Sequence, residues 1–131
     1  MTPDENARRR TILLVDDLEF FRSWLRRQLE KRGYRILEAT NGLEAIEMVS
    51  RDCPDLVVMD VNMPIMDGLA ATRRIREAGG RYQSVPILAL SAEAEMKEEA
   101  LRAGCNDYFT KGGDIYRLFA IIQSLLEDRS N

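Results

Sequence analysis

The sequence predicts an α/β protein built on a doubly wound, five-stranded parallel sheet with five helices. Three observations lead to this prediction. Short apolar runs recur along the chain, stretches with helical spacing separate them, and no internal repeat or low-complexity linker interrupts the alternation. Strands that alternate with helices form βαβ units, and their right-handed crossovers place helices on both faces of an open parallel sheet.

Five largely apolar runs are the expected strands. Each is short enough for a strand that is buried on both faces, as strands of a parallel sheet are. The most apolar of them ends in a carboxylate, Asp60. The expected strands cover Ile12–Val15, Arg35–Ala39, Leu56–Asp60, Pro86–Ser91 and Asp107–Thr110.

The stretches between and after these runs predict five amphipathic helices with recognisable ends. Glycines follow the first, third and fourth helices, a proline follows the second, and an aspartate precedes the last. The second helix is expected to turn Leu43, Ile46 and Val49 toward the core. The helices are expected from about Glu19 to Arg32, Gly42 to Arg51, Gly68 to Ala78, Glu95 to Ala103, and onward from Asp114.

Length and composition indicate one domain of ordinary size. The chain has 131 residues, and its net charge of −3 argues against a surface for nucleic acid. No apolar run approaches the length of a membrane span, and the N-terminus lacks the apolar core of a signal peptide. We therefore expect a cytoplasmic protein with no membrane partner. Residues 1–10 are interpreted as a flexible leader, 11–127 as the domain and 128–131 as a polar C-terminal end.

The residue types that are missing narrow the chemistry. The sequence contains no histidine, which removes the usual general base, the usual zinc ligand and a role as a phosphohistidine carrier. Its two cysteines, Cys53 and Cys105, have no CxxC partner and are too few for a disulfide framework. Any chemistry must therefore depend on carboxylates, hydroxyls and lysine.

Polar side chains stand at the carboxyl ends of the expected strands, where open α/β sheets bind ligands. Asp16 and Asp17 follow the first strand and Asp60 closes the third. Carboxylates brought so close repel one another unless a cation joins them, and oxygen ligands suit Mg²⁺. Ser91 and Lys111, at the ends of the last two strands, can hold phosphoryl oxygens while a carboxylate attacks phosphorus.

Taken singly, each of these residues has a simpler explanation. Asp16 and Asp17 could cap the first helix. Lys111 could be a surface lysine, and Ser91 and Tyr108 could be ordinary residues at strand ends. Residues at four strand ends would then have to imitate one site by chance, which favours a joint function.

On these residues the sequence resembles the response-regulator receiver domains of two-component signalling, of the chemotaxis and hybrid-kinase type, over about residues 11–127. The resemblance implies a flavodoxin-like receiver fold with strand order 2-1-3-4-5. It rests on Asp16-Asp17, Asp60, Asn62-Met63-Pro64-Ile65-Met66-Asp67-Gly68, Ser91-Ala92, Tyr108 and Lys111.

The resemblance assigns a cation and an acceptor. Asp60 would be the phospho-acceptor. Asp17, Asp60 and the backbone carbonyl of Asn62 would bind Mg²⁺ or Mn²⁺ directly, and Asp16 would act largely through water.

It also assigns the groups that grip and read the phosphoryl group. Ser91 and Lys111 would hold its oxygens, and Tyr108 would turn inward behind Ser91 as a switch. Asn62 and Glu93 occupy the two positions that tune phosphoryl lifetime in receivers, and their polar side chains predict rapid dephosphorylation.

The implied function is a signalling switch. A sensor histidine kinase or histidine phosphotransfer protein would donate the phosphoryl group to Asp60, and the face of the fourth helix, fifth strand and fifth helix would contact an unknown downstream protein. Such a domain is not a turnover enzyme, although it catalyses its own phosphotransfer and autodephosphorylation. The alternatives are a receiver cut from a hybrid kinase that acts as a phosphorelay or phosphate sink, a Mg²⁺-dependent aspartyl-phosphate phosphatase, and a phosphorylation-independent interaction module.

The chain departs from the family pattern at two places. Gly112 follows Lys111 where the family usually has a proline after a cis bond. Because a cis bond before a non-proline residue costs about 2.5–4 kcal/mol, we expect a trans Lys111–Gly112 bond. The stretch from Ser91 to Gly104 is also short by about half a helical turn, which predicts a clipped loop or a shorter fourth helix.

The first helix is basic on its outer side. We interpret this side as solvated surface, although receivers of this type commonly dock their kinase against the same helix. Phe20 is a candidate apolar anchor for that contact. The basic residues are Arg22, Arg26, Arg27, Lys31 and Arg32.

Overall fold

The five apolar runs form one parallel sheet in the order β2-β1-β3-β4-β5 in the computed structural model, which describes residues 9–130. All five expected strands are present, and each ends at the predicted residue. The predicted strand order is confirmed. The strands are β1 (Thr11–Val15), β2 (Arg35–Ala39), β3 (Leu56–Asp60), β4 (Ile87–Ser91) and β5 (Asp107–Thr110).

Each strand is followed by one of the five expected helices. Short 3₁₀ turns at Gly80–Tyr82 and Ala94–Met96 complete the described elements. The fourth helix, α5, has seven residues and is the shortest of the five, because the chain before it is wound as the second 3₁₀ turn. The helix therefore begins at Lys97 rather than at the predicted Glu95, and the prediction that it is shorter than in other receivers stays a prediction. The helices are α2 (Glu19–Lys31), α3 (Gly42–Asp52), α4 (Gly68–Glu77), α5 (Lys97–Ala103) and α6 (Ile115–Ser130).

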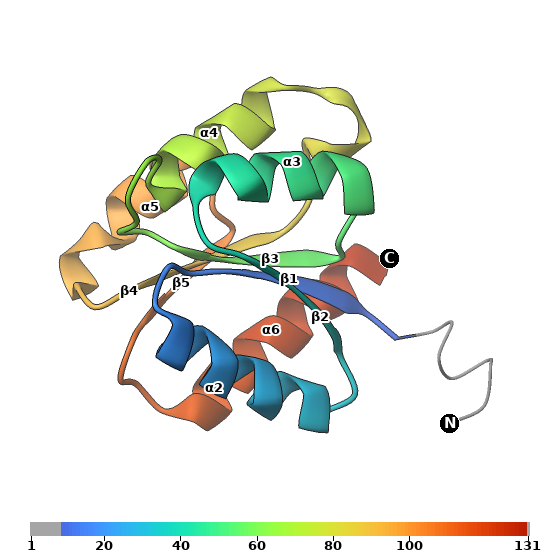
Figure 1. The fold of residues 1–131 in the computed structure, drawn as a ribbon, viewed down its shortest axis with the longest axis vertical. Coiled ribbons are helices and arrows are strands. Elements are labelled where there is room, and N and C mark those ends of the chain that lie inside the picture. Colours follow the sequence, from blue (N-terminus) through green and yellow to red (C-terminus); the bar gives the residue numbers. More distant parts are fainter. Residues whose placement is uncertain (1–8, 131) are drawn as a thin grey trace.

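The helices form two layers around the sheet (Figure 1). Helices α3, α4 and α5 cover one face, and α2 and α6 cover the other. Alternate residues of β1 enter opposite cores, with Leu13 and Val15 on the first face and Ile12 and Leu14 on the second. Burial on both faces explains why the strands read as continuous apolar runs rather than as alternating ones.

The expected inward face of α3 is corrected at one position. Leu43 is 49% exposed, whereas Ala45 and Val49 are buried. The reason is the close approach of α3 to the chain before α4. A Cβ atom on Gly42 would lie 2.7 Å from the carbonyl oxygen of Met66. The stripe of Gly42, Ala45 and Val49 therefore faces inward, and Leu43, about 100° further round the helix, turns outward.

The described part of the expected leader is attached to the start of β2. The guanidinium of Arg9 donates to the carbonyl of Gly33 at 3.1 Å, and the carbonyl of Arg10 accepts from the backbone N–H of Arg35 at 2.9 Å. Residues 1–8 of that leader and Asn131 lie outside the described residues. At the other end α6 continues through Ser130. Across residues 9–130 no helix combines the length and apolar character needed to cross a membrane.

Helix α4 begins in direct contact with the end of β3. The N–H of Gly68 donates to the carbonyl of Val61 at 2.9 Å. A Cβ atom on Gly68 would lie 2.0 Å from the carbonyl oxygen of Asp60 and 2.8 Å from Met59 Cγ. Only glycine allows the helix to start this close to the strand.

We expect Gly68→Ala to lower the free energy of unfolding by at least about 3 kcal/mol, because backbone atoms would have to move. Urea unfolding followed by circular dichroism measures the loss. Gly33→Ala is the control: Gly33 has a φ of +94° but nothing within 4 Å of its added Cβ. It should cost only about 1–2 kcal/mol of backbone strain. Equal losses in the two variants would contradict the close-approach argument.

Candidate functional site

The ends of β1 and β3 bring three carboxylates together. Val15 and Met59 are partners in the parallel register, so the residues that follow them, Asp16 and Asp60, lie side by side. One carboxylate oxygen from each of Asp16, Asp17 and Asp60 lies within 4.8 Å of the others. Asp16 and Asp60 are 4% and 3% exposed, whereas Asp17 is exposed to solvent. The cluster is thus open on the side of Asp17.

Lys111 reaches this cluster from the end of β5. Its Nζ lies 3.0 Å from Asp16 Oδ2 and 3.2 Å from Asp60 Oδ1. Its backbone N–H donates to the carbonyl of Ser91 at 2.7 Å, and its ammonium lies 4.6 Å from the ring centroid of Phe21. One positive charge is therefore held between two buried carboxylates, with an aromatic face beside it.

The surroundings change the acid strength of two groups. Burial, together with the charge of Asp16, raises the pKa of Asp60 to about 6, and Lys111 offsets only part of this effect. Burial alone would lower the pKa of Lys111, but the hydrogen bond to Asp16 and the charge of Asp60 outweigh it and raise that pKa. Asp60 is therefore harder to ionise than an ordinary aspartate, chiefly because it is buried and secondly because Asp16 is close to it.

Asp16 is held by the surrounding chain rather than by the helix start. Its Oδ1 accepts from the N–H of Leu18 at 2.9 Å, and its own N–H donates to the carbonyl of Ala39 at 3.1 Å. The N-cap residue of α2 is Leu18, and no side chain caps that helix. The simpler explanation, that Asp16 and Asp17 are helix caps, does not describe the structure.

Ser91 and Tyr108 meet at the backbone of Glu93. The Ser91 Oγ accepts from the N–H of Glu93 at 3.0 Å, and the Tyr108 hydroxyl donates to the carbonyl of the same residue. Ser91 and Tyr108 are both buried. The loop after β4 is thus tied to two strands at one residue. The sequence predicted a role only for the side chain of Glu93. A contact to its backbone does not depend on residue type and therefore could not be predicted from the sequence.

The remaining predicted residues lie in the flanking loops. Asn62 and Glu93 have exposed side chains. Between residues 9 and 130 every peptide bond is trans, so the expectation for Lys111–Gly112 is confirmed. Gly112 has a φ of +91°, which proline cannot adopt. The departure from the family pattern therefore corresponds to a different loop conformation.

The donor set fits a hard divalent cation. Three carboxylates offer oxygens at mutual distances below 4.8 Å, and a single lysine charge balances only one of them. Carboxylate oxygens are the ligands that Mg²⁺ prefers, and an exposed side such as that of Asp17 leaves room for the waters it retains. Burial raises the pKa of Asp60 and repulsion from Asp16 adds to this effect; a cation here would relieve the repulsion.

Comparisons with known proteins agree on one family. The family model described as the response regulator receiver domain matches residues 12–123. The response regulator MprA of Mycobacterium leprae is 44% identical over 117 residues, which cover 88% of this chain and 50% of the relative. The chain thus spans about half the length of the MprA relatives that it matches. The chemotaxis protein CheY of Halobacterium salinarum is 44% identical over 100 residues, covering 76% of this chain and 82% of that one.

A solved structure shares the fold and carries a cation. The receiver domain of a sensor histidine kinase from Pseudomonas aeruginosa superposes with a TM-score of 0.83 at 34% identity, covering 91% of this chain and 98% of that one. That structure has a magnesium ion coordinated in its active site cleft.

The raised pKa of Asp60 predicts a pH-dependent stability without divalent cations. The native state favours protonated Asp60, so this stabilisation is complete below pH 3.8 and is lost as pH rises through about 6. Asp60→Asn removes the effect. In EDTA we expect the variant to match the wild type near pH 4 and to exceed it by about 2 kcal/mol at pH 7.

Urea unfolding at several pH values measures this difference. Glu99 is an exposed acid on α5, and Glu99→Gln is the control, which should not gain about 2 kcal/mol over the wild type between pH 4 and pH 7. An advantage of Asp60→Asn that is the same at pH 4 and pH 7 would contradict the assignment.

Proposed function

The chain belongs to the response-regulator receiver domain family, and from this premise we propose that Asp60 accepts a phosphoryl group from a phosphohistidine of a sensor histidine kinase or a histidine phosphotransfer protein. The observation that carries the proposal is a nearly buried carboxylate that shares one sheet edge with two more carboxylates and a lysine. Burial and the charges of Asp16 and Asp17 raise the pKa of Asp60 despite the nearby lysine.

The proposed transfer is a displacement at phosphorus. An oxygen of ionised Asp60 forms the new P–O bond, the P–N bond to the donor histidine breaks, and its electron pair returns to the imidazole ring. Ionisation is required, since a protonated carboxyl is a poor nucleophile. With a pKa of about 6, Asp60 is largely ionised at neutral pH even before a cation lowers that value further.

Asp17, Asp60 and the backbone carbonyl of Asn62 would hold Mg²⁺ or Mn²⁺, with Asp16 acting through water. When bound, the cation neutralises charge that develops on the phosphoryl oxygens. The magnesium ion in the receiver domain of the Pseudomonas aeruginosa kinase supports this assignment.

Lys111 and Ser91 would bind the transferred group. The Nζ of Lys111 already lies 3.2 Å from Asp60 Oδ1, so a phosphoryl oxygen on Asp60 would lie within its reach. Ser91 stands one residue beyond Leu90, the register partner of Asp60 on β4. Its hydroxyl would donate to a phosphoryl oxygen while the strand holds its backbone in place.

The output would pass through Tyr108 and the loop after β4. Because Ser91 and Tyr108 both contact the backbone of Glu93, a movement of the Ser91 hydroxyl changes the surroundings of the Tyr108 hydroxyl. Tyr108 also lines a hollow of about 380 Å³ that lies between the start of α5, β5 and the start of α6. We propose that a downstream protein reads this α5-β5-α6 face, as a two-state element biased by phosphorylation.

A second candidate is a receiver that serves a hybrid kinase as a phosphorelay or phosphate sink. The likeness to the receiver domain of a sensor histidine kinase favours it specifically. An aspartyl-phosphate phosphatase is less well supported, because Asn62 stands where such enzymes carry a second acid. We propose the same switching activity for the whole protein. We also propose that it lies in the cytoplasm and has no nucleic-acid or membrane partner.

Acetyl phosphate with Mg²⁺ tests the acceptor. Intact mass should show a gain of one phosphoryl group in the wild type and in Glu99→Gln, and no gain in Asp60→Asn. EDTA should abolish the gain, since the carboxylates alone would repel the donor. A gain in Asp60→Asn, or repeated release of phosphate from a small phosphate ester, would contradict the proposal and favour another acceptor or a phosphatase.

The lifetime of the phosphoryl group tests Asn62 and Glu93. Both side chains can orient a water that attacks phosphorus, so we expect decay within minutes in the wild type. Asn62→Leu and Glu93→Leu together should slow it by about tenfold or more. Phosphoprotein remaining after removal of acetyl phosphate is followed by intact mass. Persistence for hours in the wild type would show the assignment to be wrong.

A further inference from the structure

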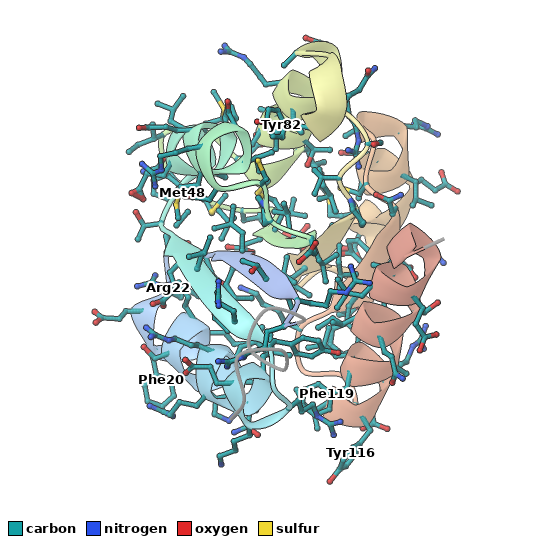
Figure 2. The ribbon with its side chains drawn as sticks, turned by 90° about the vertical axis from the view of Figure 1, so that its right-hand side faces the viewer. Phe20, Arg22, Met48, Tyr82, Tyr116 and Phe119 are labelled. Atoms are coloured by element: carbon teal, nitrogen blue, oxygen red, sulfur yellow. The ribbon has the colours of Figure 1, made fainter. Side chains whose placement is uncertain are left out.

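Arg22 is the least exposed residue of the basic side of α2. Its side chain is 12% exposed, which corrects the interpretation of this residue as solvated surface. Figure 2 shows Arg22 between α2 and the strands, and Phe20 on the outer side of the same helix. Leu25 and Leu29 anchor this helix in the core, so the position of Arg22 is fixed by packing.

The guanidinium of Arg22 bridges two acceptors. Its Nε donates to Glu38 Oε1 at 2.9 Å, and its Nη1 donates to the backbone carbonyl of Asp16 at 2.7 Å. Glu38 lies on β2, and its other oxygen accepts from Arg26 Nη1 at 2.6 Å. The planar fork of arginine suits this arrangement, since it presents two donors at a fixed angle.

The carbonyl of Asp16 belongs to the peptide unit that joins Asp16 to Asp17. The N–H of Asp16 is already held by Ala39, and both of its carboxylate oxygens are engaged, by Leu18 and by Lys111. The bond from Arg22 fixes the plane of the next peptide unit. That plane sets the direction in which Asp17, the exposed carboxylate of the cluster, leaves the chain.

We propose that Arg22, supported by Glu38, is a positioning residue that pre-organises Asp17 for binding of a divalent cation. The inference rests on the proposed function, because that function assigns the cation to this cluster. The hydrogen bonds of Arg22 go to Glu38 and to the carbonyl of Asp16, so it would not be a ligand of the cation. It acts through the backbone of Asp16, as outer groups act on metal ligands elsewhere.

Electrostatics alone predicts that removal of Arg22 tightens cation binding, which is the opposite of what the proposal predicts and makes it testable. A positive charge close to the cluster repels a cation, so its removal would tighten binding if only electrostatics counted. Loss of positioning would weaken binding instead. The sign of the change therefore separates the two roles.

Isothermal titration calorimetry with Mg²⁺ alone measures this sign. We expect Arg22→Gln to raise the dissociation constant about tenfold. Arg22→Lys keeps the charge but cannot place two donors at the angle of the guanidinium fork, so it should also weaken binding. Arg26→Gln is the matched control. Arg26 carries the same charge on the same helix and contacts the same carboxylate of Glu38, but it does not reach Asp16.

Two further readouts accompany the titrations. Circular dichroism melting establishes whether each variant is folded. If Arg22→Gln does not fold, the Mg²⁺ affinity of Arg22→Lys tests the proposal instead. In acetyl phosphate labelling, the Mg²⁺ concentration for half-maximal rate should rise in Arg22→Gln, while the rate at saturating Mg²⁺ changes less than about twofold. A merely structural role would not separate these two quantities.

Unchanged or tighter Mg²⁺ binding in folded Arg22→Gln overturns the inference, and so does an equal weakening in Arg26→Gln. Both results leave the proposed function intact if the wild type binds Mg²⁺ and is labelled at Asp60. Absence of Mg²⁺ binding in the wild type overturns the inference and the assignment of the cation together. Weakening in both Arg22 variants but not in Arg26→Gln supports the inference.

Discussion

Mutual repulsion among three carboxylates at one edge of the sheet is the constraint on which this structure depends. Asp16, Asp17 and Asp60 meet because β1 and β3 are parallel neighbours in register. A single ammonium, from Lys111, stands between the two buried members. Burial, reinforced by the charge of Asp16, raises the pKa of Asp60 despite this ammonium. A site in this condition favours a positive charge that reaches it, which would be the physical basis for the proposed binding of a cation.

The surrounding framework keeps this strained arrangement from relaxing. Glycine at position 68 lets α4 begin against the carbonyl of Asp60, so the strand end cannot swing away. Arg22, on the other face of the sheet, donates to the peptide unit that joins Asp16 to Asp17. Ser91 and Tyr108 converge on the backbone of Glu93, which links the site to the face formed by α5, β5 and α6. A structural change at Asp60 would therefore also move the elements that are packed against it.

Most of the fold and the approach of the carboxylates could be predicted from residue patterns. The strands end where predicted because each apolar run stops at a polar residue or directly before one, and the chain then turns into a loop. Periodicity failed at Leu43, since it locates a helical stripe only to within about one residue and cannot register that Gly42 abuts Met66. It failed for Arg22 as well, because a helical arginine that faces a carboxylate on a strand has the same spacing as one that faces water.

By itself, the sequence determined the alternation of strands and helices, the family, and which side chains could carry the chemistry, because these depend on residue type and spacing along the chain. The tertiary structure alone decided how those side chains are held. The bond from Arg22 to the carbonyl of Asp16, the meeting of Ser91 and Tyr108 at Glu93, and the conformation of Gly112 all involve the backbone. Backbone groups are chemically the same at almost every position, so only the folded chain selects which of them a side chain will meet.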